Sequence, residues 1–379
     1  MILAGAFFSA VYLGICAYLS GGLRRLSRSN YNFLPCEKTV SVIICARNEE
    51  KNIANLLNCL LLQTYPKNST EIIIIDDRST DKTAEIANSY KEKFENLKLI
   101  KIEKQEIGIA PKKHAFSTGL KHATGEIIVQ TDADSVVAPD WIEKLTAPFA
   151  DEEISLVQGV VKYKFTEKIS PILRIYQTLD FASHGIVAAA AINKNIPLNA
   201  NANNFAFRRA TYEELGGYGK SEKAVGGDDG LIMQNFWTAG KKIHFNFDSA
   251  VETQPEYSWK ALINQRKKWG SETQFYRPKQ IAILASIFVF YCFILISFFA
   301  IGRTQGTPLH FISLFAIKII GELFFLTKGL KYFADKKLLP HTIWVSPLNW
   351  LIVIFSVIAG IFGKFEWKGE KYRGVAQKM

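Results

Sequence analysis

The sequence predicts an α/β domain with a parallel sheet flanked by helices, together with transmembrane helices at both ends of the chain. Long uncharged apolar runs lie near the two ends of the 379 residues, and short apolar runs alternate with helical patterns between them. Runs of about 20 apolar residues are long enough to span the hydrocarbon core of a bilayer. Alternation of continuously apolar strands with helices is typical of a parallel sheet that is covered on both faces.

The apolar runs define the expected membrane segments. Three of them contain no Asp, Glu, Lys or Arg: 1–23, 281–302 and 338–363. A further apolar stretch, 308–327, contains Lys318 and Glu322, which can pair on one helix face, towards protein rather than lipid. We therefore expect an N-terminal transmembrane helix at 1–23 and a C-terminal transmembrane region at 281–363 with two or three spans. A cleaved signal peptide is the alternative at the N-terminus, but no basic residue precedes the apolar run there.

Basic residues at the ends of the middle segment indicate its side of the membrane. They follow the first apolar run and precede the second: Arg24, Arg25, Arg28, Arg277 and Lys279. Positive flanks favour the cytoplasmic side, so residues 36–278 are expected to form a cytoplasmic domain of an integral protein of the plasma or inner membrane. The basic tail, 364–379, should prefer the same side. Three C-terminal spans would carry it to the other side and two would not, so the number of spans stays open.

The composition excludes several classes of protein. An aromatic content of 13% does not suit a disordered chain. The five cysteines form no Cys-x-x-Cys pair and two of them lie inside apolar runs, which indicates neither a disulfide framework nor a zinc site. No nucleic-acid-binding motif accompanies the net charge of +11, so we expect this charge to serve anionic lipid headgroups and a phosphate-bearing substrate.

The first half of the middle segment alternates strands with helices. Strands are predicted at short apolar runs: 40–44, 71–75, 97–102 and 126–130. Helices are predicted between them, where apolar residues recur at helical spacing: 49–62, 81–94 and 112–122. Ligands of such sheets bind beyond the carboxyl ends of the strands. The polar residues that follow each strand are therefore the candidate site.

Three of the strand ends carry clusters of polar and acidic residues: 46–50, 76–81 and 131–135. Each cluster taken alone could simply cap the helix that follows it. Asp132 and Asp134 flank one small residue after an apolar strand and can reach a common hard cation. Mg²⁺ and Mn²⁺ take oxygen ligands and share them with phosphates, so this pair indicates a nucleotide-diphosphate substrate. Neither a Walker loop nor a Gly-x-Gly-x-x-Gly motif follows any strand.

Two further motifs lie downstream: Gly227-Asp228-Asp229 and Gln265-Arg266-Lys267-Lys268-Trp269. Together with the strand-end clusters, they resemble the inverting nucleotide-sugar glycosyltransferases of glycosyltransferase family 2. The likeness is closest to the membrane-bound branch of ceramide and carotenoid glucosyltransferases and processive polysaccharide synthases, and it covers nearly the whole chain. The resemblance implies a GT-A fold for residues 36–278, which is a mixed, mainly parallel sheet flanked by helices, with interfacial helices added.

The resemblance also implies roles for the strand-end residues. It assigns donor binding to residues of the early motifs: Ala46, Arg47, Glu49, Asp76, Asp77 and Lys112. Asp76 and Asp77 would contact uracil and ribose, and Lys112 would lie near the nucleotide. Asp132 and Asp134 match the Asp-x-Asp motif, with both as ligands of Mn²⁺ or Mg²⁺ and with Asp132 also in donor binding. The implied donor is a UDP-sugar.

The acceptor side is implied by the motif that ends in the acidic pair. Asp229 matches the general base, and Asp228, Arg208 and Gly217 match acceptor-side positions. An inverting transfer needs one base that takes the acceptor proton as the hydroxyl attacks. Two adjacent carboxylates disfavour joint ionisation, which raises the pKa of one of them and suits a base.

The last motif sits where a Gln-x-x-Arg-Trp signature belongs. Gln265, Lys268 and Trp269 would bind the donor, and their spacing places them on one face of a helix. Position 268 is Lys where the signature has Arg, so the planar fork that clamps a diphosphate is absent there. Arg266 or Lys267 is a candidate to replace it. The alternative for this helix is an amphipathic segment that rests on the membrane.

These features predict an inverting, metal-dependent glycosyltransferase that moves a sugar from a UDP-sugar to a membrane-associated lipid acceptor. The alternative is a processive β-polysaccharide synthase that makes an N-acetylglucosamine or glucose polymer. A non-catalytic membrane scaffold is a third hypothesis, against which the joint presence of Asp132, Asp134 and Asp229 argues. Residues 170–194 are expected to form a helix at the membrane surface, where His184 makes a structural polar contact. No nucleic-acid partner is expected.

Overall fold

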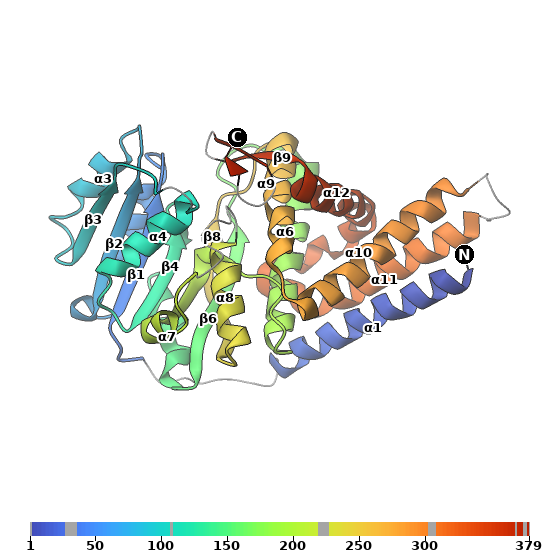
Figure 1. The fold of residues 1–379 in the computed structure, drawn as a ribbon, viewed down its shortest axis with the longest axis horizontal. Helices are drawn as coiled ribbons and strands as arrows, with labels where there is room; N and C mark the ends of the chain where they lie inside the picture. Colours follow the sequence, from blue (N-terminus) through green and yellow to red (C-terminus); the bar gives the residue numbers. More distant parts are fainter. Residues whose placement is uncertain are drawn as a thin grey trace. The chain divides into compact units, whose positions relative to one another are not determined.

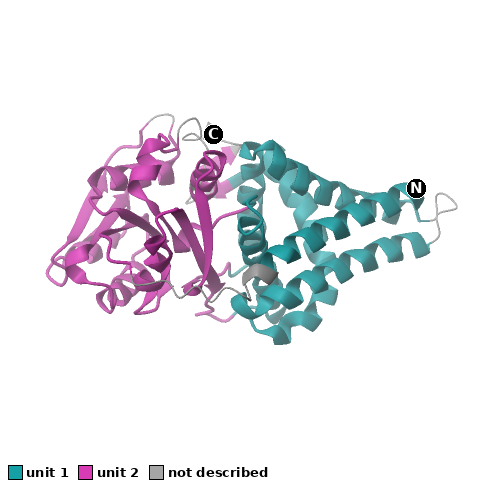
Figure 2. Ribbon diagram, turned by 90° about the horizontal axis from the view of Figure 1, so that it is seen from below, with its two compact units in different colours: residues 1–30, 169–198, 257–365 teal, residues 31–168, 199–256, 366–379 magenta. Residues whose placement is uncertain are grey.

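The computed structural model describes residues 2–26, 36–106, 109–218, 227–301, 308–367, 370–373 and 377–378. The chain divides into two compact units, which Figure 2 shows in different colours. The helical unit comprises 1–30, 169–198 and 257–365. The sheet unit comprises 31–168, 199–256 and 366–379.

The sheet unit is built on eight strands in the order β3-β2-β1-β4-β7-β6-β8-β5 (Figure 1). Their bounds are β1 Val40–Ala46, β2 Thr70–Asp77, β3 Leu97–Ile102, β4 Ile127–Asp132, β5 Val136–Val137, β6 Ile154–Tyr163, β7 Phe205–Arg208 and β8 Lys242–Thr253. Strands β3, β2, β1 and β4 are parallel to one another, and β8 is parallel to β6. Strand β7 runs antiparallel between β4 and β6, and β5 runs antiparallel to β8. The sheet is therefore mixed and mainly parallel, as predicted.

Helices cover both faces of the parallel half, because β1 and β2 are apolar on both faces. Helix α2 (Ile53–Leu61) buries Leu56 and Leu57 in the same core as Val42. Helix α4 (Pro111–His122) packs closely on the sheet at Gly119, where a Cβ atom would lie 2.8 Å from a methyl group of Ile43. The close approach of helix and strand requires glycine at this position.

The remaining helices of the sheet unit are short. Their bounds are α3 Thr83–Ser89, α5 Trp141–Thr146, α7 Arg209–Glu214 and α8 Asp228–Thr238. Helix α3 is shorter than the predicted helix at 81–94. The chain turns after Ser89, and the hydroxyl of Tyr90 donates a hydrogen bond to Asn58 Oδ1 of α2 at 2.9 Å. This contact fixes the turn against the core instead of continuing the helix.

A buried carboxylate, Glu71, joins the amino ends of several strands. Its oxygens accept hydrogen bonds from the Ser41 hydroxyl at 2.5 Å, the Thr124 amide at 2.6 Å and the Lys98 ammonium at 2.7 Å. Burial alone would raise the pKa of Glu71, but these donors lower it to about 2. Glu71 thus has a structural role at the edge of the sheet opposite to the strand-end clusters.

The helical unit contains six helices among its described residues. Their bounds are α1 Ile2–Leu26, α6 Pro171–Ile192, α9 Trp259–Glu272, α10 Pro278–Phe299, α11 Pro308–Phe333 and α12 Thr342–Phe362. Four segments are long and apolar enough to cross a membrane: Ile2–Leu23, Pro278–Phe299, Pro308–Phe333 and Lys336–Phe362. Large apolar side chains are exposed on them, for example Phe7, Leu309 and Phe362. Such a surface suits contact with lipid. Helices α6 and α9, which we expected within the middle domain, belong to this unit.

The predicted pair of Lys318 and Glu322 lies inside the bundle. Lys318 has no exposed surface, and its ammonium lies 2.6 Å from a Glu322 carboxylate oxygen and 2.7 Å from the Ser346 hydroxyl of α12. The hydroxyl of Tyr291 on α10 also donates to Glu322, at 3.4 Å. The pair therefore faces protein, as expected, and it satisfies a buried charge between three helices.

Helices α9 and α12 touch through a pair of glycines. A Cβ atom at Gly270 would overlap the carbonyl of Ser356, and one at Gly360 would overlap the carbonyl of Lys267. Small residues let two helix backbones approach each other closely. The polar helix α9 is thus joined to a helix of membrane length without side chains between them.

The tail forms a small sheet that the sequence pattern did not predict. Its strands are β9 Lys364–Trp367, β10 Glu370–Arg373 and β11 Gln377–Lys378, in the order β11-β10-β9. The sheet begins one residue after α12, since only Gly363 lies between them. Tyr372 of β10 is buried.

Candidate active site

The strand-end clusters meet at one edge of the sheet. In the register of the parallel strands, Ala46 at the end of β1 lies opposite Asp76 on β2, and Cys45 lies opposite Asp132 on β4. Neighbouring strands are about 4.8 Å apart. The structure therefore brings the first, second and third clusters side by side, as the sheet topology predicts.

Asp76 and Asp77 differ in their surroundings. The carboxylate of Asp77 is buried and accepts two hydrogen bonds from Arg78, at 2.8 Å and 3.2 Å. Asp76 is also buried, and its Oδ1 accepts no hydrogen bond from the described part of the chain. A buried acceptor without a donor is costly, so Asp76 is suited to accept a hydrogen bond from a ligand at this edge.

The loops after β1 and β2 are bound to each other. Asn48 has a φ of 55°, and its side-chain oxygen accepts a hydrogen bond from the Thr80 amide at 2.8 Å. The amide of Glu49 donates to the Thr83 hydroxyl at 2.7 Å. Asp81 accepts from the Thr83 amide at 3.0 Å and so stabilises the start of α3. These contacts fix the place of Glu49, whose carboxylate accepts from a neighbouring asparagine.

Asp132 and Asp134 lie among charged groups. The ammonium of Lys112 on α4 is 2.8 Å from Asp132 Oδ1, so these two predicted residues are in contact. Burial, followed by the charges of Asp132 and Glu49, raises the pKa of Asp134 to about 6. The hydroxyl of Thr253 on β8 opposes this rise, with a hydrogen bond of 3.2 Å to Asp134. Three carboxylates thus repel one another at this edge, which favours binding of a cation.

The donor set suits a divalent cation that shares its ligands with a phosphate. Among the described residues there is no group of three or more His, Cys, Asp or Glu side chains that could hold a metal ion. The Asp132–Asp134 pair therefore offers only part of a coordination shell. Mg²⁺ and Mn²⁺ commonly complete such a shell with water and phosphate oxygens.

The loop that carries Asp134 is fixed by two buried asparagines. The carbonyl of Asn203 accepts from the Thr131 hydroxyl at 2.8 Å, and its side-chain nitrogen donates to the Ser135 hydroxyl at 3.2 Å. Asn204 accepts from the indole of Trp141 at 2.9 Å. The side chains of this pair thus support the site from inside the core.

Arg208 does not lie at the edge of the sheet that carries Asp76, Asp132 and Asp134, which we call the acidic edge. Strand β7 is antiparallel to β4, and Arg208 lies opposite Ile127, at the amino end of β4. Asp132 is five residues further along β4, which corresponds to about 16 Å of strand.

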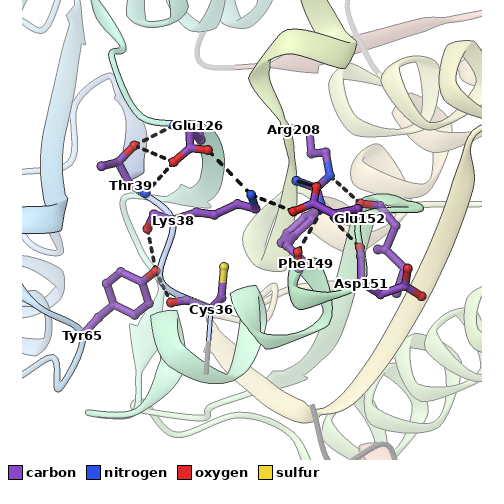
Figure 3. A network of polar contacts seen from close by, with 10 residues as sticks. Cys36, Lys38, Thr39, Tyr65, Glu126, Phe149, Asp151, Glu152 and Arg208 are labelled. Atoms are coloured by element: carbon purple, nitrogen blue, oxygen red, sulfur yellow. Dashed lines mark hydrogen bonds and ion pairs between the residues drawn. The ribbon is translucent and has the colours of Figure 1, made fainter. Parts of the chain in front are cut away.

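Arg208 instead belongs to a network at the opposite edge (Figure 3). Its guanidinium donates to the carbonyls of Ile154 at 2.8 Å and Phe149 at 2.9 Å. It also pairs with Glu152 at 3.0 Å, and Glu152 in turn pairs with Lys38 at 2.9 Å. We therefore withdraw Arg208 from the acceptor side.

Asp229 lies at the N-terminus of α8. The chain enters the helix through Gly227, which has a φ of 69°, and the carboxylate of Asp229 accepts a hydrogen bond from the Gly230 amide at 2.7 Å. A helix N-terminus favours a negative charge. Gly217 has a φ of 65° and its carbonyl accepts from Asn235 of α8 at 2.9 Å. The side chain of Asp228 lies outside the described part of the chain.

Gln265, Lys268 and Trp269 lie on α9 in the helical unit. Their role in donor binding stays a prediction, because the acidic edge belongs to the sheet unit. Arg266 is buried on the same helix, and its guanidinium carbon lies 4.0 Å from the centre of the Trp269 ring. Its side chain also donates to Gln265.

The sequence reasoning missed the partner of Arg266, which is Asp180 on α6. Asp180 Oδ2 lies 2.7 Å from Nε and 2.5 Å from Nη2 of Arg266. Its other oxygen accepts from Asn349 of α12 at 2.8 Å. Burial alone would raise the pKa of Asp180, but the charge of Arg266 holds it below the ordinary value. Arg266 is thus engaged with Asp180, and it does not replace the fork that Lys268 lacks. An acid inside an apolar helix was the only signal for Asp180.

His184 makes the structural contact that we expected. Its Nδ1 lies 2.8 Å from the carbonyl oxygen of Asp180, one turn earlier on α6. Its ring lies edge-on to Trp269, with 5.3 Å between the ring centres.

Comparison with known proteins finds similarity to glycosyltransferases. Residues 41–215 match the sequence model described as "Glycosyl transferase family 2". The chain is 29% identical over 301 residues to the protein named "Probable glycosyltransferase YdaM" of Bacillus subtilis (strain 168), covering 76% of this chain and 69% of that protein. It is 37% identical over 119 residues to the beta-monoglucosyldiacylglycerol synthase of a Nostoc species, covering 31% of this chain and 25% of that enzyme.

A solved structure has the same fold. The mannosyltransferase PcManGT from Pyrobaculum calidifontis, in complex with GDP-Man and Mn²⁺, superposes with a TM-score of 0.59 at 19% identity. The alignment covers 95% of this chain and 97% of that one.

Proposed function

We propose that this chain, a nucleotide-sugar glycosyltransferase whose residues 41–215 match the family 2 model, moves a sugar from a UDP-sugar to a lipid acceptor in the membrane. The transfer inverts the anomeric configuration and uses Mn²⁺ or Mg²⁺. The sheet unit lies on the cytoplasmic side of the plasma or inner membrane in this proposal.

The observation that carries the proposal is the set of charges at the carboxyl edge of β1, β2 and β4. Asp132 and Asp134 lie close to Glu49, and Lys112 contacts Asp132 at 2.8 Å. A divalent cation there would relieve the repulsion between the acids and neutralise charge on a departing diphosphate. Lys112 can hold the same phosphates from the other side, since an ammonium donates up to three hydrogen bonds.

The protein's own side chains divide the other tasks. Asp76 accepts a hydrogen bond from the base of the donor with its buried Oδ1. The next residue, Asp77, is held by Arg78 and contacts the ribose. Asp229 takes the proton of the attacking hydroxyl as the general base. Its carboxylate lies at the start of α8, where the Gly230 amide holds one oxygen by a hydrogen bond of 2.7 Å.

A lipid acceptor is supported by the four helices of membrane length. The name of the Nostoc relative, a glucosyldiacylglycerol synthase, also refers to a lipid product. A processive synthase is the rival proposal. The two proposals differ in where the label from a labelled UDP-sugar is found. A processive synthase would leave it in high-mass polymer, whereas a single transfer to lipid would leave it in material that organic solvent extracts.

The test uses the full chain purified in detergent and a panel of UDP-sugars and GDP-sugars with lipid extracts. We expect UDP release that needs Mn²⁺ or Mg²⁺ and stops with EDTA. Asp134→Asn and Asp229→Asn should each lower turnover by at least about 100-fold. Asp248→Asn, which changes an exposed acid on the same sheet, is the matched control and should keep full activity. Turnover that survives Asp229→Asn would remove the base from the proposal, and turnover in EDTA would remove the metal.

A further inference from the structure

The C-terminal sheet of the tail reaches the loops that carry the donor motifs. Glu370 of β10 pairs with Arg47, the residue that follows β1, with 3.2 Å between Oε1 and Nη2. Both side chains are less than one-fifth exposed, at 17% and 18%. An ion pair that is largely shielded from water is held more firmly than one on the surface.

Tyr372 completes this contact from the same strand. The side chain is 2% exposed, and its hydroxyl donates a hydrogen bond of 2.7 Å to Oε2 of Glu370. Both carboxylate oxygens of Glu370 are therefore engaged, one by Arg47 and one by Tyr372. Lys371 lies between them in sequence and is exposed, so the strand turns one face to the loops and the other to solvent.

The charges of the tail also reach Arg78, the residue that follows β2. Burial and the hydrogen bond with Glu370 raise the pKa of Tyr372, and the charges of Arg47 and Arg78 oppose the rise. The charges of Glu370 and Tyr372 likewise act on Arg78, whose main partner is Asp77. Glu370 thus contacts Arg47 directly, whereas the hydrogen bonds of Arg78 go to Asp77.

We propose that Glu370 and Tyr372 are positioning residues of the donor site, which hold Arg47 in the place where it meets the nucleotide. This rests on the proposed function. Ordering a long arginine side chain costs conformational entropy, and a fixed partner meets that cost before the ligand arrives. The reacting bond would be handled by Asp132, Asp134 and Asp229. Loss of the tail contact should therefore weaken donor binding more than it slows the chemical step.

Steady-state kinetics with the full chain in detergent tests this role. Glu370→Gln should raise the KM for the nucleotide sugar by about tenfold, with kcat changed by less than about twofold. Tyr372→Phe, which removes only the hydroxyl, should raise KM by about threefold. Lys371→Gln removes a charge from the exposed face of the same strand and should leave both constants as they are.

A double mutant separates positioning from a general loss of structure. If Glu370 acts through Arg47, Glu370→Gln should raise KM by less than about twofold in the Arg47→Gln background. An equal effect in both backgrounds would overturn the proposal. An unchanged KM in Glu370→Gln, or a lower one that shows Glu370 competing with the donor for Arg47, would overturn it too.

The same experiment distinguishes this proposal from the function on which it rests. If the wild-type chain releases no nucleotide from any nucleotide sugar, the proposed function fails and the tail proposal fails with it. If wild type turns over and Glu370→Gln behaves like Lys371→Gln, only the tail proposal fails.

Discussion

Replacement of Arg266 by methionine would leave the Asp180 carboxylate without its cation in the interior of the helical unit. Asp180 is 2% exposed and Arg266 is 5% exposed. Methionine has about the length of the arginine stem, so the change removes the guanidinium with its charge, its hydrogen bonds and its contact with Trp269. The ion pair joins α6 to α9, and Asn349 extends the contact to α12.

The magnitude follows from this burial. Removing one partner of a buried pair costs about 3–5 kcal/mol, because the other charge stays buried without compensation. For a unit of this size, this corresponds to a Tm lower by about 10 °C. The double variant Arg266→Met/Asp180→Leu removes both charges. It should lose less than about 2 kcal/mol, the remainder being the unpaired amide of Asn349.

Thermal unfolding of the detergent-solubilised chain measures these differences. Lys260→Met changes an exposed basic residue on the same helix and should shift Tm by no more than about 1 °C. Our reasoning would be refuted by an Arg266→Met variant as stable as this control. A double variant whose loss equals or exceeds that of Arg266→Met alone would also refute it, since the pair would then not be coupled.

Three further changes test other parts of the fold. The pKa of Glu71 is lowered to about 2, so the ionised carboxylate stabilises the fold at neutral pH, and this stabilisation is lost as the pH falls towards 2. The difference in free energy of unfolding between wild type and Glu71→Gln, measured by chemical denaturation, should therefore narrow by about half between pH 6 and pH 3. Gly159→Ala forces a Cβ into the amide of a buried asparagine and should cost about 1–3 kcal/mol in the same assay, whereas no loss would show that this core can adjust. Lys318→Met leaves Glu322 without its cation and should reduce the fraction of the protein that elutes as a single peak in size-exclusion chromatography. Lys318→Met/Glu322→Leu should restore part of that fraction, because the second change removes the uncompensated acid.

The acidic edge could be predicted from the sequence because it depends on local patterns. Strands β1 and β2 are continuous apolar runs, and parallel strands bring their carboxyl ends to one edge whatever the details of packing. Asp76 and Asp132, at the ends of β2 and β4, therefore reach the same edge of the sheet, where Lys112 of α4 contacts Asp132. The inward pair of Lys318 and Glu322 was predictable for a similar reason, since a spacing of four sets the face of a helix.

Other features depend on contacts between distant parts of the chain, and no local pattern reports them. We expected Arg208 itself on the acceptor side, but β7 runs antiparallel to β4 and carries Arg208 to the opposite edge of the sheet. Asp180 and Arg266 are 86 residues apart, and neither position shows its partner. The strands of the tail have at most four residues, so no periodicity distinguishes Tyr372 as buried.

The glycine contact between α9 and α12 has a consequence for how the enzyme responds to its lipid environment. Because backbone meets backbone at Gly270 and Gly360, a tilt of α12 carries α9 and Trp269 with it. Hydrophobic mismatch makes a spanning helix tilt when the hydrocarbon layer becomes thinner. On the predicted role of Trp269 in donor binding, turnover in nanodiscs should therefore vary with acyl-chain length, and bulky replacements at Gly360 should abolish that dependence by separating the two helices.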